Sequence, residues 1–477
     1  MKDKINELKE LSSLLEPDSN DREFFISKII KYTENFLTNI NEIPVYRTTI
    51  DNGSGIYNSP ISENPTSIDD LLKILKVNVD TPGINPASHG HLGFIPGGGV
   101  FYSALGDYIA DITNRYAGVF FASPGAVRME NMLTDWMSEL IGFPKSSGGN
   151  LTSGGSIANL IGIVTARDSL KLKAEDFKRS VIYLSEHIHH SVDKAIRIAG
   201  LKECPRRYIS LDENYKIRAD ELEQVIRTDK ASGLLPWLII ASAGTTDVGA
   251  IDPLDELGNI AKKFNCWFHV DAAYGGFFIL TDRGKKKLIG LDKSDSVVMD
   301  PHKGLFLPYG TGAVLVKDKH NLYESHYYNA NYMQDASLNN EELAPADLSP
   351  ELSKHFRGLR LWFPLKLAGV SAFKNALEEK LLLAQYFYEQ LKEIKGFEVG
   401  PYPDLSVVTY RYIPKTGNAD EFNKKLIREI QEEGKVFISS TILNGKFTLR
   451  AAILSFRTHL DTVDLLADIL KHKVKGF

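Results

Sequence analysis

Cysteine is almost absent from this sequence. Only Cys204 and Cys266 occur among its 477 residues, so the chain has neither a disulfide framework nor a cluster of thiolate metal ligands. This scarcity is typical of proteins of the reducing cytoplasm. The opening 25 residues are charged throughout and lack the apolar core of a secretory signal. We therefore expect a cytoplasmic protein.

The sequence also lacks a long run of basic residues and an apolar run that could cross a membrane. Its 56 basic and 61 acidic residues give a net charge of −5, which argues against a dedicated nucleic-acid-binding protein. The stretch 81–106 carries no formal charge, but Pro82, Pro86, Pro96 and the glycines 97–99 would break a helix there. A small-molecule substrate fits this composition better.

The length predicts two or three domains. Apolar residues recur at helical spacing over 5–15 and 24–40, which predicts two amphipathic opening helices, followed by a polar connector at 48–66. A pair of helices cannot bury its apolar stripe alone. We expect it to pack on the rest of the chain or on a second subunit.

Short apolar runs alternate with longer helical stretches in the middle of the chain, which predicts a mainly parallel sheet covered on both faces. These runs are 181–184, 237–240, 266–270, 296–299 and 313–316. The polar clusters SEHIHH, ASAGTT, DAAYGG and DPHKG follow the first four. Because ligands bind beyond the carboxyl ends of the strands in such sheets, we expect these clusters to meet in one crevice.

The pattern changes after Trp362. It predicts a long helix at 364–394, strands around 397–412, a helix at 419–433, a hairpin at Asn444-Gly445 and a closing helix. We expect a smaller α+β domain here.

A Gly/Ser loop within residues 148–168 leads directly into a helix-forming stretch. Amide groups at a helix N-terminus, left accessible by Gly154 and Gly155, would form a phosphate site to which Ser153 and Ser156 add hydroxyl groups. A flexible loop capped by serine explains the same segment equally well.

Two charged residues follow buried strands. Asp271 precedes small residues, and a buried carboxylate there should be paired with a cation, which a protonated pyridine nitrogen would supply. A strand-end cap or a metal ligand is the alternative.

Lys303, beside His302 and Asp300, could have its pKa lowered by partial burial and act as a Schiff-base nucleophile. A solvated lysine is the alternative.

His189 could lie flat against a planar ring, although a histidine in a polar loop is more often a surface residue. Histidines 187, 189 and 190 raise the possibility of a metal site, but no cysteine or HxxxH partner supports one, and we expect none. A phosphate loop, a carboxylate, a lysine and a flat aromatic at one sheet edge together meet the needs of one cofactor, pyridoxal phosphate (PLP).

Residues 86–362 resemble the PLP-dependent group II amino acid decarboxylases, the family of aromatic L-amino acid decarboxylase and glutamate decarboxylase. The motifs that carry the resemblance are HLGFIP, ASPGAVRMENMLTDWM, TSGGSIAN, HHSVDKA, AGTTDVGAIDPL, WFHVDAAYGG, DPHKG and FRGLRLW. It implies the α/β fold of fold type I PLP-dependent enzymes, with a mainly parallel central sheet flanked by helices. It further implies a helical segment (1–88) that packs on a partner subunit, a large PLP-binding domain (89–363), a small α+β domain (364–477), and a homodimer.

The resemblance also implies a role for each matching residue. Lys303 would bind the cofactor as a Schiff base and Asp271 would contact the pyridine nitrogen. His189 and Ala273 would lie on opposite faces of the ring, with Thr246 beside it. The phosphate would be held by Ser153, Gly154, Gly155, Ser156 and His302.

Three positions depart from the family pattern. His190 stands where the animal enzymes carry a small hydroxyl residue, Asp300 stands in place of asparagine, and Gly304 replaces a bulky residue. The first two alter local ring or phosphate contacts, but none of the three removes a catalytic role.

The resemblance implies decarboxylation of an L-amino acid to the amine and carbon dioxide. Tyr332 matches the tyrosine of the family's mobile loop and would supply the proton to Cα; relatives that form aldehydes by oxidative decarboxylation carry phenylalanine there. An aminotransferase and an inactive regulatory protein are less favoured alternatives.

The resemblance also implies that Phe94 and Pro96 line the side-chain pocket, with Phe120 from the segment 116–121 of the other subunit. This lining is mainly apolar, so we expect an aromatic substrate rather than glutamate or aspartate. His89 and His91 could instead contact a polar side chain.

Overall fold

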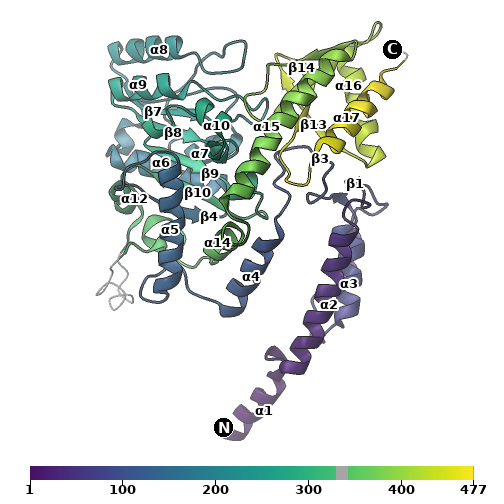
Figure 1. Cartoon of the computed structure of the whole chain (residues 1–477). Helices are drawn as coiled ribbons and strands as arrows, with labels where there is room; N and C mark the ends of the chain where they lie inside the picture. Colours follow the sequence, from purple (N-terminus) through teal and green to yellow (C-terminus); the bar gives the residue numbers. More distant parts are fainter. Residues whose placement is uncertain (329–341, 476–477) are drawn as a thin grey trace.

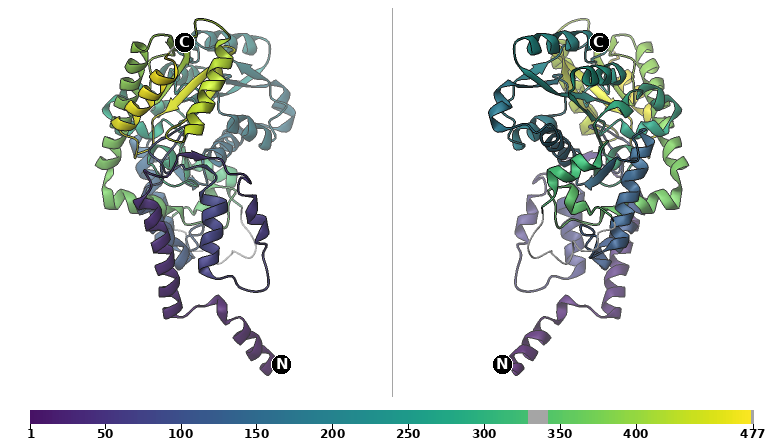
Figure 2. Two further views of the ribbon diagram at one scale, coloured as in Figure 1. Left: turned by 90° about the vertical axis from the view of Figure 1, so that its right-hand side faces the viewer. Right: turned by 90° about the vertical axis from the view of Figure 1, so that its left-hand side faces the viewer.

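The computed structural model describes residues 1–328 and 342–475. Three helices form an N-terminal arm, α1 (Lys2–Leu11), α2 (Ser19–Thr38) and α3 (Ile68–Leu75). Figure 1 shows this arm in purple, leaving the body of the molecule with the N-terminus at its far end, and both views of Figure 2 agree. In the described chain, none of the residues of these helices is buried. The two predicted opening helices are confirmed.

A short antiparallel ribbon joins the arm to the body. It consists of β1 (Tyr46–Arg47) and β2 (Gly83–Ile84). The helix α4 (Phe101–Thr113) follows and packs against α14 (Arg357–Ala368). Among the described residues, no helix is long and apolar enough to cross a membrane.

The large sheet lies at the centre of the body and has seven strands within the described residues. In spatial order they are β4 (Gly148–Thr152), β10 (Gly312–Val316), β9 (Ser296–Met299), β8 (Trp267–Asp271), β7 (Leu235–Ser242), β5 (Ser180–Leu184) and β6 (Arg206–Tyr208). All neighbours pair in parallel except β10, which is antiparallel to both β4 and β9. The predicted α/β fold with a mainly parallel sheet is confirmed.

Helices cover both faces of this sheet, because side chains of its strands alternate between two hydrophobic clusters. Val181 and Tyr183 face one cluster, whereas Ile182 and Leu184 face the other. The first face packs on α5 (Pro124–Leu140), α8 (Ala219–Ala231), α9 (Leu254–Phe264) and the segment before α10 (Asp282–Lys287). The second packs on α6 (Gly155–Ser169), α7 (His190–Ile198) and α12 (Lys319–His326).

The C-terminal part carries a second sheet, which has five strands within the described residues. They are β11 (Phe397–Val399), β12 (Val407–Tyr412), β14 (Lys446–Ala452), β13 (Phe437–Leu443) and β3 (His91–Leu92). One face packs on α15 (Val370–Glu393), α16 (Ala419–Glu433) and α17 (Leu460–Lys473). His91 and Leu92, which the predicted boundary assigns to the large domain, pair with β13 in this sheet.

Two sequence predictions need correction. The single helix at 364–394 is two helices, since Gly369 adopts φ of 73° between α14 and α15. Residues 148–152, interpreted as loop, form the buried strand β4. The predicted hairpin is confirmed, because Asn444 and Gly445 both have positive φ, 50° and 74°, as a tight two-residue turn requires.

Candidate active site

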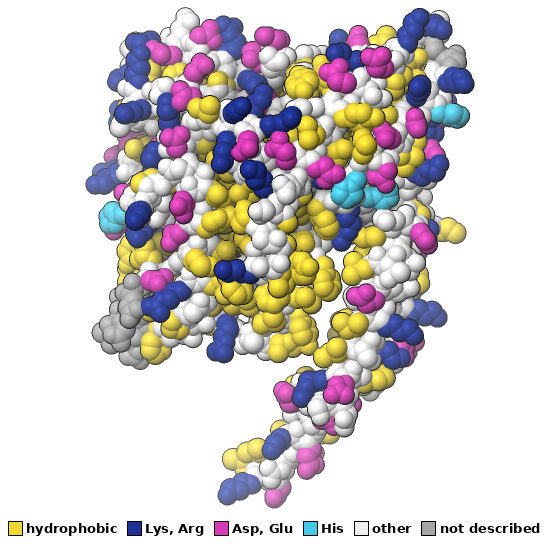
Figure 3. Space-filling model, in the orientation of Figure 1, with side chains coloured by type: hydrophobic (Ala, Val, Ile, Leu, Met, Phe, Trp, Pro, Cys, Tyr) yellow, Lys and Arg dark blue, Asp and Glu magenta, His cyan; other side chains and the backbone are white. Residues whose placement is uncertain are grey.

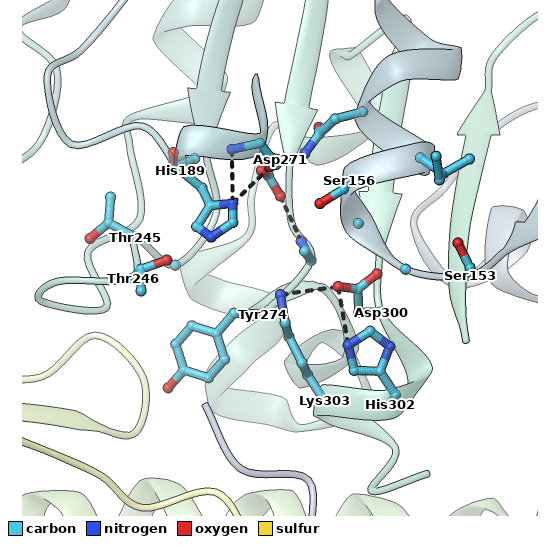
Figure 4. Close-up of a pocket in the computed structure, with 18 residues that line it drawn as sticks. Ser153, Ser156, His189, Thr245, Thr246, Asp271, Tyr274, Asp300, His302 and Lys303 are labelled. Carbon is cyan, nitrogen blue, oxygen red and sulfur yellow. Dashed lines mark hydrogen bonds and ion pairs between the residues drawn. The ribbon is translucent and has the colours of Figure 1, made fainter. Parts of the chain in front are cut away.

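The carboxyl ends of β4, β5, β7, β8 and β9 open onto one cavity of about 460 Å³ (Figure 4). All ten residues predicted to bind the cofactor line this cavity: Ser153, Gly154, Gly155, Ser156, His189, Thr246, Asp271, Ala273, His302 and Lys303. The predicted meeting of the four polar clusters is therefore confirmed. The fifth apolar run, which no such cluster follows, is the antiparallel strand β10, so its carboxyl end points the other way.

The first turn of α6 forms one wall of the cavity. Gly154 has φ of 153°, a backbone conformation that favours glycine. A Cβ atom on Gly155 would lie 2.9 Å from Asp300 Oδ2 and 3.3 Å from Ala273 Cβ, so a larger residue would collide with the opposite wall. The helix N-terminus and its accessible amide groups can therefore receive an anionic group such as a phosphate.

Asp271 ends β8 and is held by a buried polar chain. Asn159 Nδ2 donates to Asp271 Oδ2 over 2.9 Å, and Asn159 Oδ1 lies 2.9 Å from His269 Nε2. Burial lowers the pKa of His269 to about 4, so its ring is neutral at pH 7. Trp267 Nε1 donates to Ser296 Oγ, which leaves the serine hydroxyl to donate to His269 Nδ1, and His269 Nε2–H to donate to Asn159.

His189 lies beside Asp271 and is held by the same amide. Its Nδ1 lies 2.7 Å from Ser191 Oγ, which also accepts a hydrogen bond of 3.1 Å from Asn159 Nδ2. Burial lowers the pKa of His189, with His190 and Lys303 acting in the same direction. A neutral imidazole fixed in this way can present a flat face to a planar ring.

The other histidines of the SEHIHH cluster have different neighbours. His187 stacks on Tyr215, with ring centroids 5.3 Å apart, and His190 packs against the His189 ring at 4.1 Å. Within residues 1–328 and 342–475, no group of three or more His, Cys, Asp or Glu side chains is placed to hold a metal ion.

Lys303 lies in α11 (Pro301–Gly304), across the cavity from Asp271 and His189 (Figure 4). Its Nζ is 3.0 Å from Asp300 Oδ2, and His302 Nε2 is 3.7 Å from the same oxygen. Burial acts to lower the pKa of Lys303, but the carboxylates of Asp300 and Asp271 outweigh it, so the pKa is raised. The lowered pKa expected from the sequence is therefore wrong for this chain, because burial was weighed without the paired carboxylate.

Arg450 connects the small sheet to this cavity. From β14 it donates to the carbonyl oxygen of Thr246 over 2.6 Å and to that of Phe94 over 3.0 Å. Burial lowers its pKa to about 10, which leaves the guanidinium charged at pH 7. Arg450 thus holds the loop of Thr246 in place, a role that no local motif indicated.

The predicted substrate-pocket residues do not line this cavity in the single chain. Phe94 is 57% exposed and adopts φ of 54°, whereas Pro96 and Phe120 are buried. Phe120 lies under the Arg128 guanidinium, 5.2 Å from its ring centroid. Tyr332 falls outside the described residues. The roles of these four residues stay predictions.

Comparison with known proteins identifies the family. The family model described as pyridoxal-dependent decarboxylase conserved domain matches residues 57–413. The chain belongs to this decarboxylase family. It is 35% identical over 419 residues to an aromatic-L-amino-acid decarboxylase of Bacillus atrophaeus, covering 87% of this chain and 86% of that protein. It is also 27% identical to a phenylacetaldehyde synthase of Petunia hybrida, over 97% of this chain and 95% of that protein.

A comparison with solved structures supports the same family. The crystal structure of Oryza sativa TDC with PLP and tryptamine superposes with a TM-score of 0.89 at 25% identity, covering 96% of this chain and 98% of that chain. The present protein is thus a PLP-dependent amino acid decarboxylase. Its cavity fits PLP, since a glycine-walled helix N-terminus, a buried carboxylate and a half-buried lysine surround one space.

Proposed function

We propose that this decarboxylase converts an aromatic L-amino acid to the corresponding amine and carbon dioxide. The relation to the Bacillus atrophaeus aromatic-L-amino-acid decarboxylase carries the proposal. The cavity lining supports it, because Lys303 is the single Lys or Arg among the described residues that line it. A second cation that could hold the side-chain carboxylate of glutamate or aspartate is not among them.

Each part of the cofactor has a counterpart in the proposed site. The N-terminus of α6, with Gly154 and Gly155, suits the phosphate, to which the hydroxyl groups of Ser153 and Ser156 and the His302 ring can add hydrogen bonds. Lys303 supplies the amine that attaches the cofactor. When bound, PLP provides an electron sink for the electron pair that the departing carboxylate leaves behind.

The remaining residues hold charges and protons in place. Asp271 would keep a proton on the pyridine nitrogen of bound PLP, because a buried carboxylate favours a cation beside it. Neutral His189 would cover one face of the ring, while Ala273 would leave room on the other face and Thr246 would lie beside the ring. Tyr332, which lies outside the described residues, is proposed to hold the proton that is delivered to the substrate Cα.

Oxidative decarboxylation to an aldehyde is the second candidate. The similarity to the Petunia hybrida phenylacetaldehyde synthase favours it. Tyr332 favours the simple reaction, since a phenol can return a proton to Cα before oxygen reacts there.

We further propose that two copies of the chain form a dimer in which the segment 1–88 packs on the partner. Large apolar side chains are exposed on the arm and on α4, and Figure 3 shows such side chains gathered over the lower front of the body. The exposed apolar side chains include Ile5, Leu8, Leu11, Phe25 and Ile29 on the arm, and Tyr102, Leu105, Tyr108 and Ile112 on α4. Exposed apolar side chains gathered in this way favour an interface with another chain. Phe94 and Phe120 would complete the substrate pocket across it.

The test uses the PLP-loaded protein with single aromatic, acidic, basic and aliphatic amino acids. Products are identified by mass spectrometry, and peroxide is measured in parallel. We expect amine from the aromatic substrates without peroxide, and a loss of about three orders of magnitude or more in the Lys303→Ala variant. Amine from an acidic substrate alone would refute the aromatic assignment. Aldehyde with ammonia and peroxide would replace the simple reaction by the oxidative one.

A further inference from the structure

Asp300 lies between β9 and α11 and is 1% exposed. Its Oδ2 atom faces Lys303 Nζ at 3.0 Å and His302 Nε2 at 3.7 Å. Beyond these ion-pair contacts, neither carboxylate oxygen has a hydrogen-bond donor among the described residues. Figure 4 shows the Lys303 and His302 side chains both directed toward Asp300. The carboxylate therefore depends on Lys303 for its charge balance.

Glycine backbones enclose this carboxylate on two sides. A Cβ atom on Gly155 would lie 2.9 Å from Oδ2, and one on Gly312 would lie 2.6 Å from Oδ1. The two glycine walls thus limit the movement of the carboxylate on those sides, and its remaining side borders the cavity that Lys303 also lines. A fixed buried carboxylate strongly favours a cation at this distance.

We propose that Asp300 is a positioning residue that holds Lys303 as an ammonium ion whenever this lysine is not bonded to the cofactor. The inference rests on the proposed role of Lys303. If a substrate amine takes the place of Lys303 while the C=N nitrogen stays protonated, the substrate ammonium ion would lose two protons. The nitrogen of Lys303 would gain two and become an ammonium ion. Asp300 then binds the released ammonium group at the wall and keeps it out of the substrate's space.

The other groups that face Lys303 are less suited to this task. Charged or titratable side chains that interact with Lys303 are Asp300, Asp271, Tyr309, His189 and His302. Asp271 already accepts hydrogen bonds from Asn159 and from the amide of Ala273. Burial lowers the pKa of both histidines, which favours their neutral form, and a neutral imidazole cannot balance the charge of an ammonium ion. Asp300 is left as the fixed anion nearest to the amine.

The first experiment measures the charge of Lys303 in the full-length chain without cofactor. Limited labelling with acetic anhydride across a pH series, read by mass spectrometry of the Lys303 peptide, gives the midpoint at which the amine becomes reactive. In Asp300→Asn, which keeps the shape of the side chain, we expect this midpoint to fall by about 1 to 3 pH units. Asp292→Asn removes the same charge from an exposed position and should leave it unchanged. Equal midpoints in all three proteins would overturn the proposal.

The second experiment measures the exchange in the PLP-loaded enzyme. An aromatic amino acid methyl ester, which has no free carboxylate to lose, is added, and borohydride then traps the cofactor on whichever amine holds it. We expect Asp300→Asn to retain about ten times more cofactor on Lys303 than the unmodified chain, because the released lysine has lost its partner. Asp300→Ser, with folding checked by circular dichroism, serves if the asparagine variant does not fold. Equal retention in the variant and the unmodified chain would contradict the proposal.

The two proposals fail in different ways. If borohydride traps the cofactor on a residue other than Lys303 in the unmodified enzyme, the assigned role of Lys303 is wrong. The labelling midpoint in the cofactor-free chain still reports whether Asp300 controls the charge of this lysine.

Discussion

Among single residues, Asn159 connects the largest part of the polar chain described at the cavity: its side chain contacts Asp271, Ser191 and His269. Its side-chain amide contacts the Asp271 carboxylate and the Ser191 hydroxyl that holds His189, and it accepts a hydrogen bond from His269. One amide therefore fixes both Asp271, the group proposed to contact the pyridine nitrogen, and His189, the group proposed to cover the ring. The neutral state of His269 sets the direction of this chain of hydrogen bonds.

Replacing Asn159 with alanine should weaken PLP binding. The change removes a hydrogen bond to the charged Asp271, which contributes about 1.5 to 3 kcal/mol, so we expect the dissociation constant of PLP to rise about 10- to 100-fold. Equilibrium titration followed by cofactor fluorescence measures it. Asn423→Ala is the matched control, since Asn423 is equally buried but bonds to Tyr412 in the small domain. It should lower stability without changing the dissociation constant. The same constant in all three proteins would contradict the role of Asn159.

Lys303 illustrates why single residues are hard to interpret in isolation. The sequence placed the lysine beside a buried strand, and the structure agrees. Its pKa, however, depends on the distance to Asp300 and on the position of Asp271, which a sequence does not give. The sign of the expected shift was wrong for this reason.

Among the elements, β4 is a buried strand that the sequence did not predict, as it also did not predict the short strands β1, β2, β3 and β6. Gly148 and Gly149 have low strand propensity, but Gly149 lies so close to β10 that a Cβ atom would be 2.5 Å from the Val314 carbonyl oxygen. Tertiary packing therefore makes this strand. It delivers Ser153 and Gly154 to the cavity at the same sheet edge as the other strands.

A buried ion pair between Lys354 and Glu130 joins α5, β4 and α14. Lys354 Nζ donates to Glu130 Oε2 of α5 over 2.8 Å, and to Asn150 Oδ1 and the Leu151 carbonyl of β4 over 3.1 Å. Glu130 Oε1 accepts from the amide of Gly358 in α14. Both charged side chains are almost fully buried, with exposures of 0% and 2%.

Replacing Lys354 with methionine should strongly destabilise the protein. The change leaves Glu130 buried without its cation, which costs about 3 to 5 kcal/mol of unfolding free energy. Urea denaturation measures the effect, and Glu130→Gln in the same background should recover part of it. Lys424→Met breaks an exposed pair with Glu421 and should change the stability by about 0.5 kcal/mol or less. Similar effects of the two lysine variants would mean that the buried pair does not hold these elements together.

In the whole molecule, the N-terminal arm (α1–α3) exposes apolar side chains that the rest of the described chain does not cover. The helices α1–α3 bury none of their residues in the described chain, although α2 carries exposed Phe24, Phe25, Ile29 and Ile30. Burying apolar area of this kind is favourable by about 25 cal/mol per Å², so a partner surface is expected.

Charges on the arm should separate the proposed dimer. We expect the unmodified protein to sediment as a dimer at micromolar concentration, and the double variant Phe25→Asp, Ile29→Asp to bind its partner at least about 100-fold more weakly. Thr228→Asp with Ser232→Asp adds the same charge to exposed positions around α8 and should leave the dimer intact. Sedimentation velocity distinguishes these outcomes. A monomeric unmodified protein would refute the dimer.

The fold class, the cofactor and the ten predicted residues that line the cavity could be inferred from the sequence alone. Each of these residues follows a strand within a short motif, and the carboxyl ends of parallel strands must share one edge. The order of motifs along the chain is therefore enough to bring His189, Asp271 and Lys303 into one crevice, whereas Ser153 follows β4, which the sequence did not predict.

The hydrogen-bonding partners of these side chains, in contrast, are seen only in the folded chain. Asn159 lies 112 residues from Asp271 and 110 from His269, and Arg450 lies 204 residues from Thr246. No local pattern specifies contacts over such separations. They form because helices and strands pack at fixed distances, and those distances determine which buried charges and polar groups become neighbours.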